Sequence, residues 1–146
     1  MKYYITIFVF AMFTALLGSC DLETSDNGDL DGMWRLESVD TLATSGSKDM
    51  TGTKFYWSFQ LHLLQLDDKA GGHNSVLLRF EHSGGTLRLY DPYLYNREEG
   101  DEQLTDVQYL APFGVNMLEE ECTVERLSGS KMTLKTPTIS LGFRKL

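Results

Sequence analysis

The sequence predicts an all-β domain, a barrel or sandwich built from many short strands. From Gly32 onward, apolar residues mostly recur at every second position, which is the period of a strand with one buried face. These alternating runs are short, evenly spaced and separated by turns rich in Gly and Ser, as in sandwiches and barrels. With 42% hydrophobic and 23% charged residues, the chain has the composition of a domain with a packed core.

The first two strands are expected at residues 33–39 and 55–63. In the second, one face carries only apolar side chains, namely Phe55, Trp57, Phe59, Leu61 and Leu63. Leu64 and Leu66 then fall on the opposite face. This change of phase indicates a bulge, a strand switch or a second buried surface.

The middle of the chain predicts a hairpin. A turn rich in Asp and Gly at 67–74 leads into a strand with Val76, Leu78 and Phe80 facing inward. Ser83-Gly84-Gly85 is a tight-turn sequence that connects this strand to the next, at 86–90. Pro92 is expected to break or bend that second strand, because proline cannot donate to a sheet ladder.

The C-terminal half predicts a charged loop at 96–103, a short strand at 104–110 and an ambiguous segment at 113–121. That segment is either one helical turn or irregular structure ahead of a strand at 123–127. Ser128-Gly129-Ser130 is another hairpin turn. In the last two strands the inward residues are expected to be Met132, Leu134, Ile139, Leu141 and Phe143.

The N-terminus has the pattern of a secretion signal. Lys2 precedes an apolar run at 5–17, which is shorter than the roughly 20 residues of a membrane-spanning helix and fits a signal peptide. The run ends in Leu17-Gly18-Ser19-Cys20, which resembles the lipobox of bacterial lipoproteins. The resemblance implies that residues 1–19 are removed and that Cys20 carries acyl chains such as palmitate. The alternative is an ordinary cleaved signal beside a chance cysteine.

The acidic stretch 20–29 is expected to act as a tether between the lipid and a domain at 30–146. It resembles the acidic export signals of lipoproteins from the Bacteroides group, which implies the outer membrane and the cell surface. Under the sorting rule of enteric bacteria, Asp21 would instead hold the protein at the inner membrane. A plain solvated tether is the third interpretation.

An acylated Cys20 leaves Cys122 without a partner for an intrachain disulfide. Cys122 is then either a small buried hydrophobe or a reactive thiol. Because it follows Glu119-Glu120-Glu121, its thiol pKa is expected to be raised, which opposes a nucleophilic role.

Gly32-Met33-Trp34, which opens the first strand, resembles the Gly-x-Trp motif of lipocalins. In layout, residues 30–146 resemble the lipocalin-like lipoproteins of Bacteroides-type bacteria. The resemblance implies an antiparallel up-and-down barrel of about eight strands. It further implies that Arg144 covers the Trp34 ring in a cation–π contact and closes one end of the barrel with Gly32.

A lipocalin-like barrel also implies a binding site for a small apolar or amphipathic ligand. We expect its lining to include Trp57, Phe59, Leu61, Leu78 and Phe80. A rim of Tyr90, Tyr93 and Tyr95 is another possible lining. The alternative is that the aromatic residues are core and that the tyrosines lie in a loop.

Several functions are not expected. The net charge of −8 and the lack of a basic patch with interleaved aromatics argue against nucleic-acid binding. His62, His73 and His82 lack metal-site spacing, and the acidic pattern at 27–32 has Ser38 where a calcium loop needs Glu. Without a nucleophile elbow or a phosphate-cradling loop, we expect no enzyme, metal or cofactor.

The sequence supports two functional hypotheses. One is a binding module with a small ligand at the mouth of the barrel. The other is a structural or accessory subunit at the cell surface, with a filled barrel and a protein partner. Its predicted contact patch consists of Leu64, Leu66 and Leu77.

Overall fold

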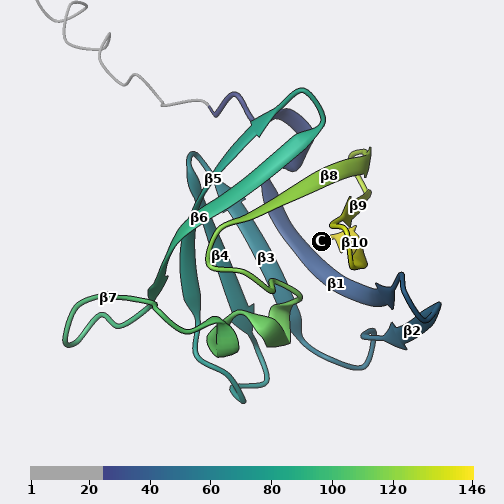
Figure 1. Ribbon diagram of the computed structural model, residues 1–146. Helices are drawn as coiled ribbons and strands as arrows, with labels where there is room; N and C mark the ends of the chain where they lie inside the picture. The colour runs from purple at the N-terminus through teal and green to yellow at the C-terminus, as the bar shows by residue number, and fades with distance from the viewer. Residues whose placement is uncertain (1–24) are drawn as a thin grey trace, which may run out of the picture.

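Eight antiparallel strands close into a barrel in the computed structural model, which describes residues 25–146 (Figure 1). The strands are β1 (Gly32–Thr41), β3 (Phe55–Gln60), β4 (Leu63–Asp68), β5 (Val76–Ser83), β6 (Thr86–Leu94), β8 (Glu120–Leu127), β9 (Lys131–Lys135) and β10 (Ile139–Lys145). Each pairs with the next along the chain, and the pairing of β10 with β1 closes the barrel. The expected up-and-down barrel is confirmed.

Two short strands lie outside the barrel. β2 (Gly46–Asp49) pairs with the second half of β1, and β7 (Glu102–Gln103) pairs with the end of β6. The strand predicted at 104–110 is wrong. There the Asp106 side chain accepts the Gln108 N–H and begins a 3₁₀ turn, η3 (Val107–Tyr109).

The β3–β4 hairpin explains the leucines that fall out of phase. β3 ends at Gln60, Leu61 adopts a φ of 54°, and Gln60 pairs with Leu63 across the turn. Because paired residues share a face, Leu63 points outward with Gln60 and is 49% exposed. The inward orientation predicted for Leu63 is therefore wrong, and Leu61, predicted to face inward within a strand, lies partly buried in the turn.

The same turn buries the next two inward positions of β4. Leu64 and Leu66 are both 0% exposed. They belong to the core, so the contact patch predicted from them does not exist.

β6 is bent where Pro92 was expected to disturb it. Leu77 pairs with Tyr93 and Arg79 with Tyr90, so Asp91 and Pro92 together stand opposite Leu78. Asp91 has a φ of 48°, in the left-handed region that side chains other than glycine seldom adopt. The strand continues through this bulge to Leu94.

One end of the barrel, called the closed end here, is covered by the segment that precedes β1. The Leu30 side chain is buried at the end of a 3₁₀ turn, η2 (Gly28–Leu30). The Leu30 carbonyl accepts the Trp34 Nε1–H at 2.8 Å. Asn27 Nδ2 donates to the Leu61 carbonyl at 2.7 Å. The last residues of the predicted tether are thus docked on the barrel.

The cation over Trp34 is Lys145 and not Arg144. Lys145 pairs with Trp34, and its Nζ lies 5.1 Å from the ring centroid. Arg144 is one position away and therefore on the outer face, where its Nε lies 3.3 Å from Glu37 Oε1. Because side chains alternate along a strand, Lys145 shares the face of Trp34 and Arg144 does not.

The opposite end of the barrel is filled by the connection 104–119, called the plug here, which Figure 1 shows in green below the strands. Four of its apolar side chains are buried: Leu104, Leu110, Phe113 and Val115. The plug contains η3 and a second 3₁₀ turn, η4 (Ala111–Phe113). The short helical segment thus lies just ahead of the expected range 113–121 and meets it at Phe113.

The predicted signal at 1–19 and the predicted lipidation site, Cys20, lie outside the described residues. In the part that the structure describes, no helix is long and apolar enough to span a membrane.

Candidate functional site

Four of the predicted ligand-binding residues lie together inside the barrel, in contact with other core side chains. Trp57, Phe59, Leu78 and Phe80 are each at most 2% exposed. The rings of Phe59 and Phe80 meet edge to face with centroids 5.1 Å apart. Leu61 is not among them, because it forms the β3–β4 turn.

The plug completes the filling of the interior. The Phe113 ring lies 5.3 Å from that of Phe55, and the Phe113 carbonyl accepts the Trp57 Nε1–H at 3.1 Å. Gly114, at a φ of 90°, packs so closely that a Cβ there would lie 2.7 Å from Cδ2 of Leu141. An eight-stranded barrel is just wide enough to be filled by its own side chains, and this one is.

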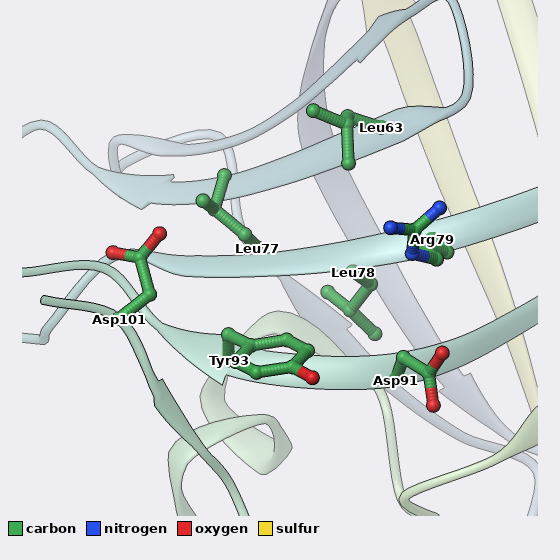
Figure 2. Close-up of a pocket in the computed structure, with 7 residues that line it drawn as sticks. All are labelled: Leu63, Leu77, Leu78, Arg79, Asp91, Tyr93 and Asp101. Atoms are coloured by element: carbon green, nitrogen blue, oxygen red, sulfur yellow. The ribbon is translucent and has the colours of Figure 1, made fainter.

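A groove lies on the outer face of the barrel (Figure 2). It has a volume of about 260 Å³, and its lining comes from β4, β5, β6 and the loop before β7: Leu63, Leu77, Leu78, Arg79, Asp91, Tyr93 and Asp101. Of the predicted ligand-binding residues, only Leu78 borders it. Of the three tyrosines considered as a rim, only Tyr93 does.

Strand register and the β6 bulge together build the groove. Leu77 pairs with Tyr93 and Leu63 pairs with Arg79, so these four side chains adjoin on the outer surface. The bulge places Asp91 beside them (Figure 2). The result is an apolar strip bordered by one cation and two carboxylates.

Two of the charged groups at the groove are available to a ligand. Within residues 25–146, Arg79 and Asp91 have no oppositely charged side chain within 4.0 Å. Asp101 is partly engaged, because its Oδ1 accepts the Asn96 N–H at 2.9 Å. A partly exposed apolar strip with unpaired charges of both signs is suited to an amphipathic molecule.

The plug carries a second candidate surface. Three of its apolar side chains are exposed, Tyr109 by 38%, Met117 by 60% and Leu118 by 36%. Met117 and Leu118 also border a shallow hollow of about 700 Å³ with Asp106 and Val107.

The three consecutive glutamates have different roles. Glu119 pairs with Arg88 at 2.7 Å, and Glu121 is exposed. Glu120 is 6% exposed, and its carboxylate accepts the Asn116 N–H at 2.8 Å. Burial raises the pKa of Glu120. This arrangement supports the loop that enters β8.

Cys122 is a buried side chain, 1% exposed. Burial, together with Glu120 and Glu121, raises the pKa of its thiol to about 12. The raised thiol pKa expected from the sequence is confirmed, with burial as the largest cause.

The three histidines lie in three different elements, with His62 and His73 in turns and His82 on β5. His73 Nδ1 lies 2.9 Å from Asp68 Oδ2, and His62 lies in the β3–β4 turn. Across residues 25–146, no group of three or more His, Cys, Asp or Glu side chains is placed to hold a metal ion.

Comparison with known proteins identifies the fold and the family. The lipocalin-like domain family matches residues 14–146. A lipocalin-like protein from Bacteroides uniformis superimposes with a TM-score of 0.63 at 23% identity, covering 82% of this chain and 100% of that one. An uncharacterized protein from Bacteroides eggerthii gives 0.57 at 15% identity, covering 80% of this chain and 98% of that one. No curated protein matches.

Proposed function

This chain belongs to the lipocalin-like domain family, and we propose that it is a membrane-anchored lipoprotein whose barrel binds a small amphipathic ligand in the outer groove. One observation carries the proposal. The interior is occupied by the protein's own side chains, whereas the groove combines exposed Leu63 with the unpaired charges of Arg79 and Asp91.

The interior is the less favoured location for a ligand. An internal ligand would have to displace the plug, which means removing Phe113 from its contact with Phe55 and breaking its hydrogen bond with Trp57. The groove needs no such rearrangement. Its volume of about 260 Å³ is near the lower end of small-molecule sites, so it suits a small ligand or one end of a longer one.

The lining specifies the chemistry of the ligand. Leu63, Leu77 and Tyr93 offer an apolar surface to an acyl or alkyl segment. Arg79 can bind an anionic group such as a phosphate, and Asp91 a cationic group such as an ammonium. A single-chain zwitterionic amphiphile satisfies all three features.

This proposal can be tested by purifying the protein from its own membranes and identifying any retained ligand by mass spectrometry. The wild type is expected to release an amphiphile that Leu63→Asp does not retain. Leu42→Asp is the matched control, because Leu42 is 40% exposed and lies away from the groove. Equal retention by both variants, or no ligand in the wild type, would contradict it.

The proposal of an anchor is supported by the sequence pattern at Leu17-Gly18-Ser19-Cys20. We place the lipid-anchored protein at the outer membrane and the cell surface on the strength of the acidic stretch 20–29. Metabolic labelling with a palmitate analogue checks the acylation. Wild type is expected to be labelled and membrane-bound, whereas Cys20→Ser is expected to lose both properties; a labelled Cys20→Ser would contradict the anchor.

A second candidate function is that of an accessory subunit with a protein partner. It is favoured by Met117 and Leu118, which border one hollow of the plug, and by the exposed Tyr109 in the same connection. Crosslinking in intact cells, followed by purification, is expected to recover a partner with the wild type and not with Met117→Asp. Recovery of this protein alone would count against this function.

A further inference from the structure

A row of cations lies on the outer face of the barrel across β1, β10, β9 and β8. Arg35 pairs with Arg144, and Arg144 pairs with Lys131 on the next strand. Arg126 lies close by on β8, opposite Thr133. Arg126, Lys131 and Arg144 are exposed, and Arg35 is partly exposed. These four residues are called the basic wall here.

The basic wall carries uncompensated positive charge. Glu37 is shared by two of its members, with Oε1 2.9 Å from Arg35 Nη2 and 3.3 Å from Arg144 Nε. Within the described part of the chain, Arg126 and Lys131 have no carboxylate within 4.0 Å. Like charges directly opposite one another on neighbouring strands are destabilising.

The composition of the chain makes this cluster unexpected. Lys and Arg number 13 against 21 Asp and Glu, and the net charge is −8. A concentration of cations on one wall of an acidic barrel is therefore complementary to an anionic partner.

The position of the wall indicates which anionic surface that is. Lys131 directly follows the β8–β9 turn, and Arg144 adjoins Lys145, so the row lies near the closed end. The N-terminal segment docks at this same end, where Lys145 Nζ donates to the Asp29 carbonyl at 2.8 Å. From Cys20 to Asn27, an extended chain spans at most about 25 Å, at up to 3.6 Å per residue.

We propose that the basic wall lies against the anionic headgroup layer of the membrane in which the acyl chains of Cys20 are embedded. This inference rests on the proposed lipid anchor. The short tether lets the wall reach the bilayer surface, where electrostatic attraction extends about 8 Å at physiological salt. Asp26 and Asp29 are exposed at the closed end, where anionic headgroups would repel them. This repulsion disfavours an orientation with the closed end against the bilayer and favours one with the basic wall against it.

The orientation has a consequence for the groove. Strand order runs β10-β9-β8-β6-β5-β4-β3-β1 around the barrel, so β4 and β5 lie across from β9 and β10. A barrel resting on β9 and β10 therefore presents the groove to the solvent side, where a ligand can reach it.

The experiment uses the full lipidated protein in vesicles with and without phosphatidylglycerol. One fluorescent probe is attached at Thr133→Cys, on the wall, and another at Glu81→Cys, on β5 across the barrel. Native Cys122 is buried and does not interfere. With a quencher attached to the lipid headgroups, the probe at 133 is expected to be quenched more strongly than the probe at 81 in anionic vesicles.

Neutralising the wall is expected to remove this difference. In the variant Arg126→Gln, Lys131→Gln and Arg144→Gln, each lost cation should lower the preference for the wall-down orientation roughly fivefold, since a cation near an anionic bilayer contributes about 1 kcal/mol. The control makes the same change of charge elsewhere, with Lys48→Gln, Lys54→Gln and Arg97→Gln, and should retain the preference.

Three results would overturn the orientation: equal quenching at both positions, the same preference in zwitterionic vesicles, or an equal loss of preference in the control. Flotation of the vesicles separates this outcome from failure of the anchor. Wild-type protein that floats with the vesicles and shows no preference contradicts the orientation alone. Wild-type protein that does not float contradicts the anchor, and the orientation with it.

Discussion

At the scale of single residues, the closed end depends on the surroundings of Trp34. Its indole N–H donates to Leu30, and the Lys145 ammonium lies over its ring. Gly32 has a φ of 111°, and a Cβ there would lie 3.0 Å from Cε of Lys145. Glycine is therefore required both for the backbone conformation and for the path of the lysine side chain.

Removing Lys145 should destabilise the barrel more than removing Arg144. A cation over a Trp ring contributes about 1 kcal/mol, whereas an exposed ion pair such as Arg144–Glu37 contributes about 0.5 kcal/mol or less. Urea unfolding of Lys145→Ala and Arg144→Ala measures the difference. A larger loss of unfolding free energy for Arg144→Ala would contradict the assignment of Lys145 as the cation that covers Trp34.

The Cys122 thiol should be unreactive in the folded protein and should make stability fall at high pH. Burial raises its pKa from 9.0 to about 12, so the folded state favours the neutral thiol. The contribution of this thiol to the free energy of unfolding is fully present below pH 9 and is lost as the pH rises from 9 towards 12. Alkylation at pH 8 should require unfolding, and Cys122→Ala should show a smaller loss of stability over that range; rapid alkylation of folded protein would contradict this.

At the scale of elements, two connections determine what the strands enclose. The β3–β4 turn sets the phase that buries Leu64 and Leu66 and exposes Leu63. The plug then supplies Phe113 and its apolar neighbours to the end of the barrel that the strands leave unfilled. Both effects depend on where a turn ends, which strand periodicity does not reveal.

Gly114 is the position where the plug is most sensitive. Its φ of 90° and the 2.7 Å approach of Leu141 leave no room for a Cβ. Gly114→Ala should cost at least about 2 kcal/mol in the free energy of unfolding, from overpacking and backbone strain. Gly129→Ala is the matched control, because no atom lies within 4 Å of its Cβ position, and it should be nearly neutral. Similar melting temperatures for the two variants would show that the plug is loosely packed.

At the scale of the whole molecule, much of the fold could be predicted from the sequence. Alternation indicated most of the barrel strands, turn residues indicated the hairpins, and Pro92 indicated the bend in β6. The groove could not be predicted, because Leu63, Arg79 and Asp91 become neighbours only through register between three strands. The plug could not be predicted either, because its buried residues follow neither the period of a strand nor that of a helix.

We propose that a ligand binds on the outer face of a filled barrel. A titration with a single-chain phosphocholine amphiphile below its micelle concentration, followed by backbone amide NMR shifts, tests it most directly. We expect saturable shifts centred on Leu77, Arg79 and Tyr93, which Leu63→Asp abolishes and Leu42→Asp preserves. Shifts centred instead on Trp57, Phe59 and Phe113, with release of the plug, would contradict it.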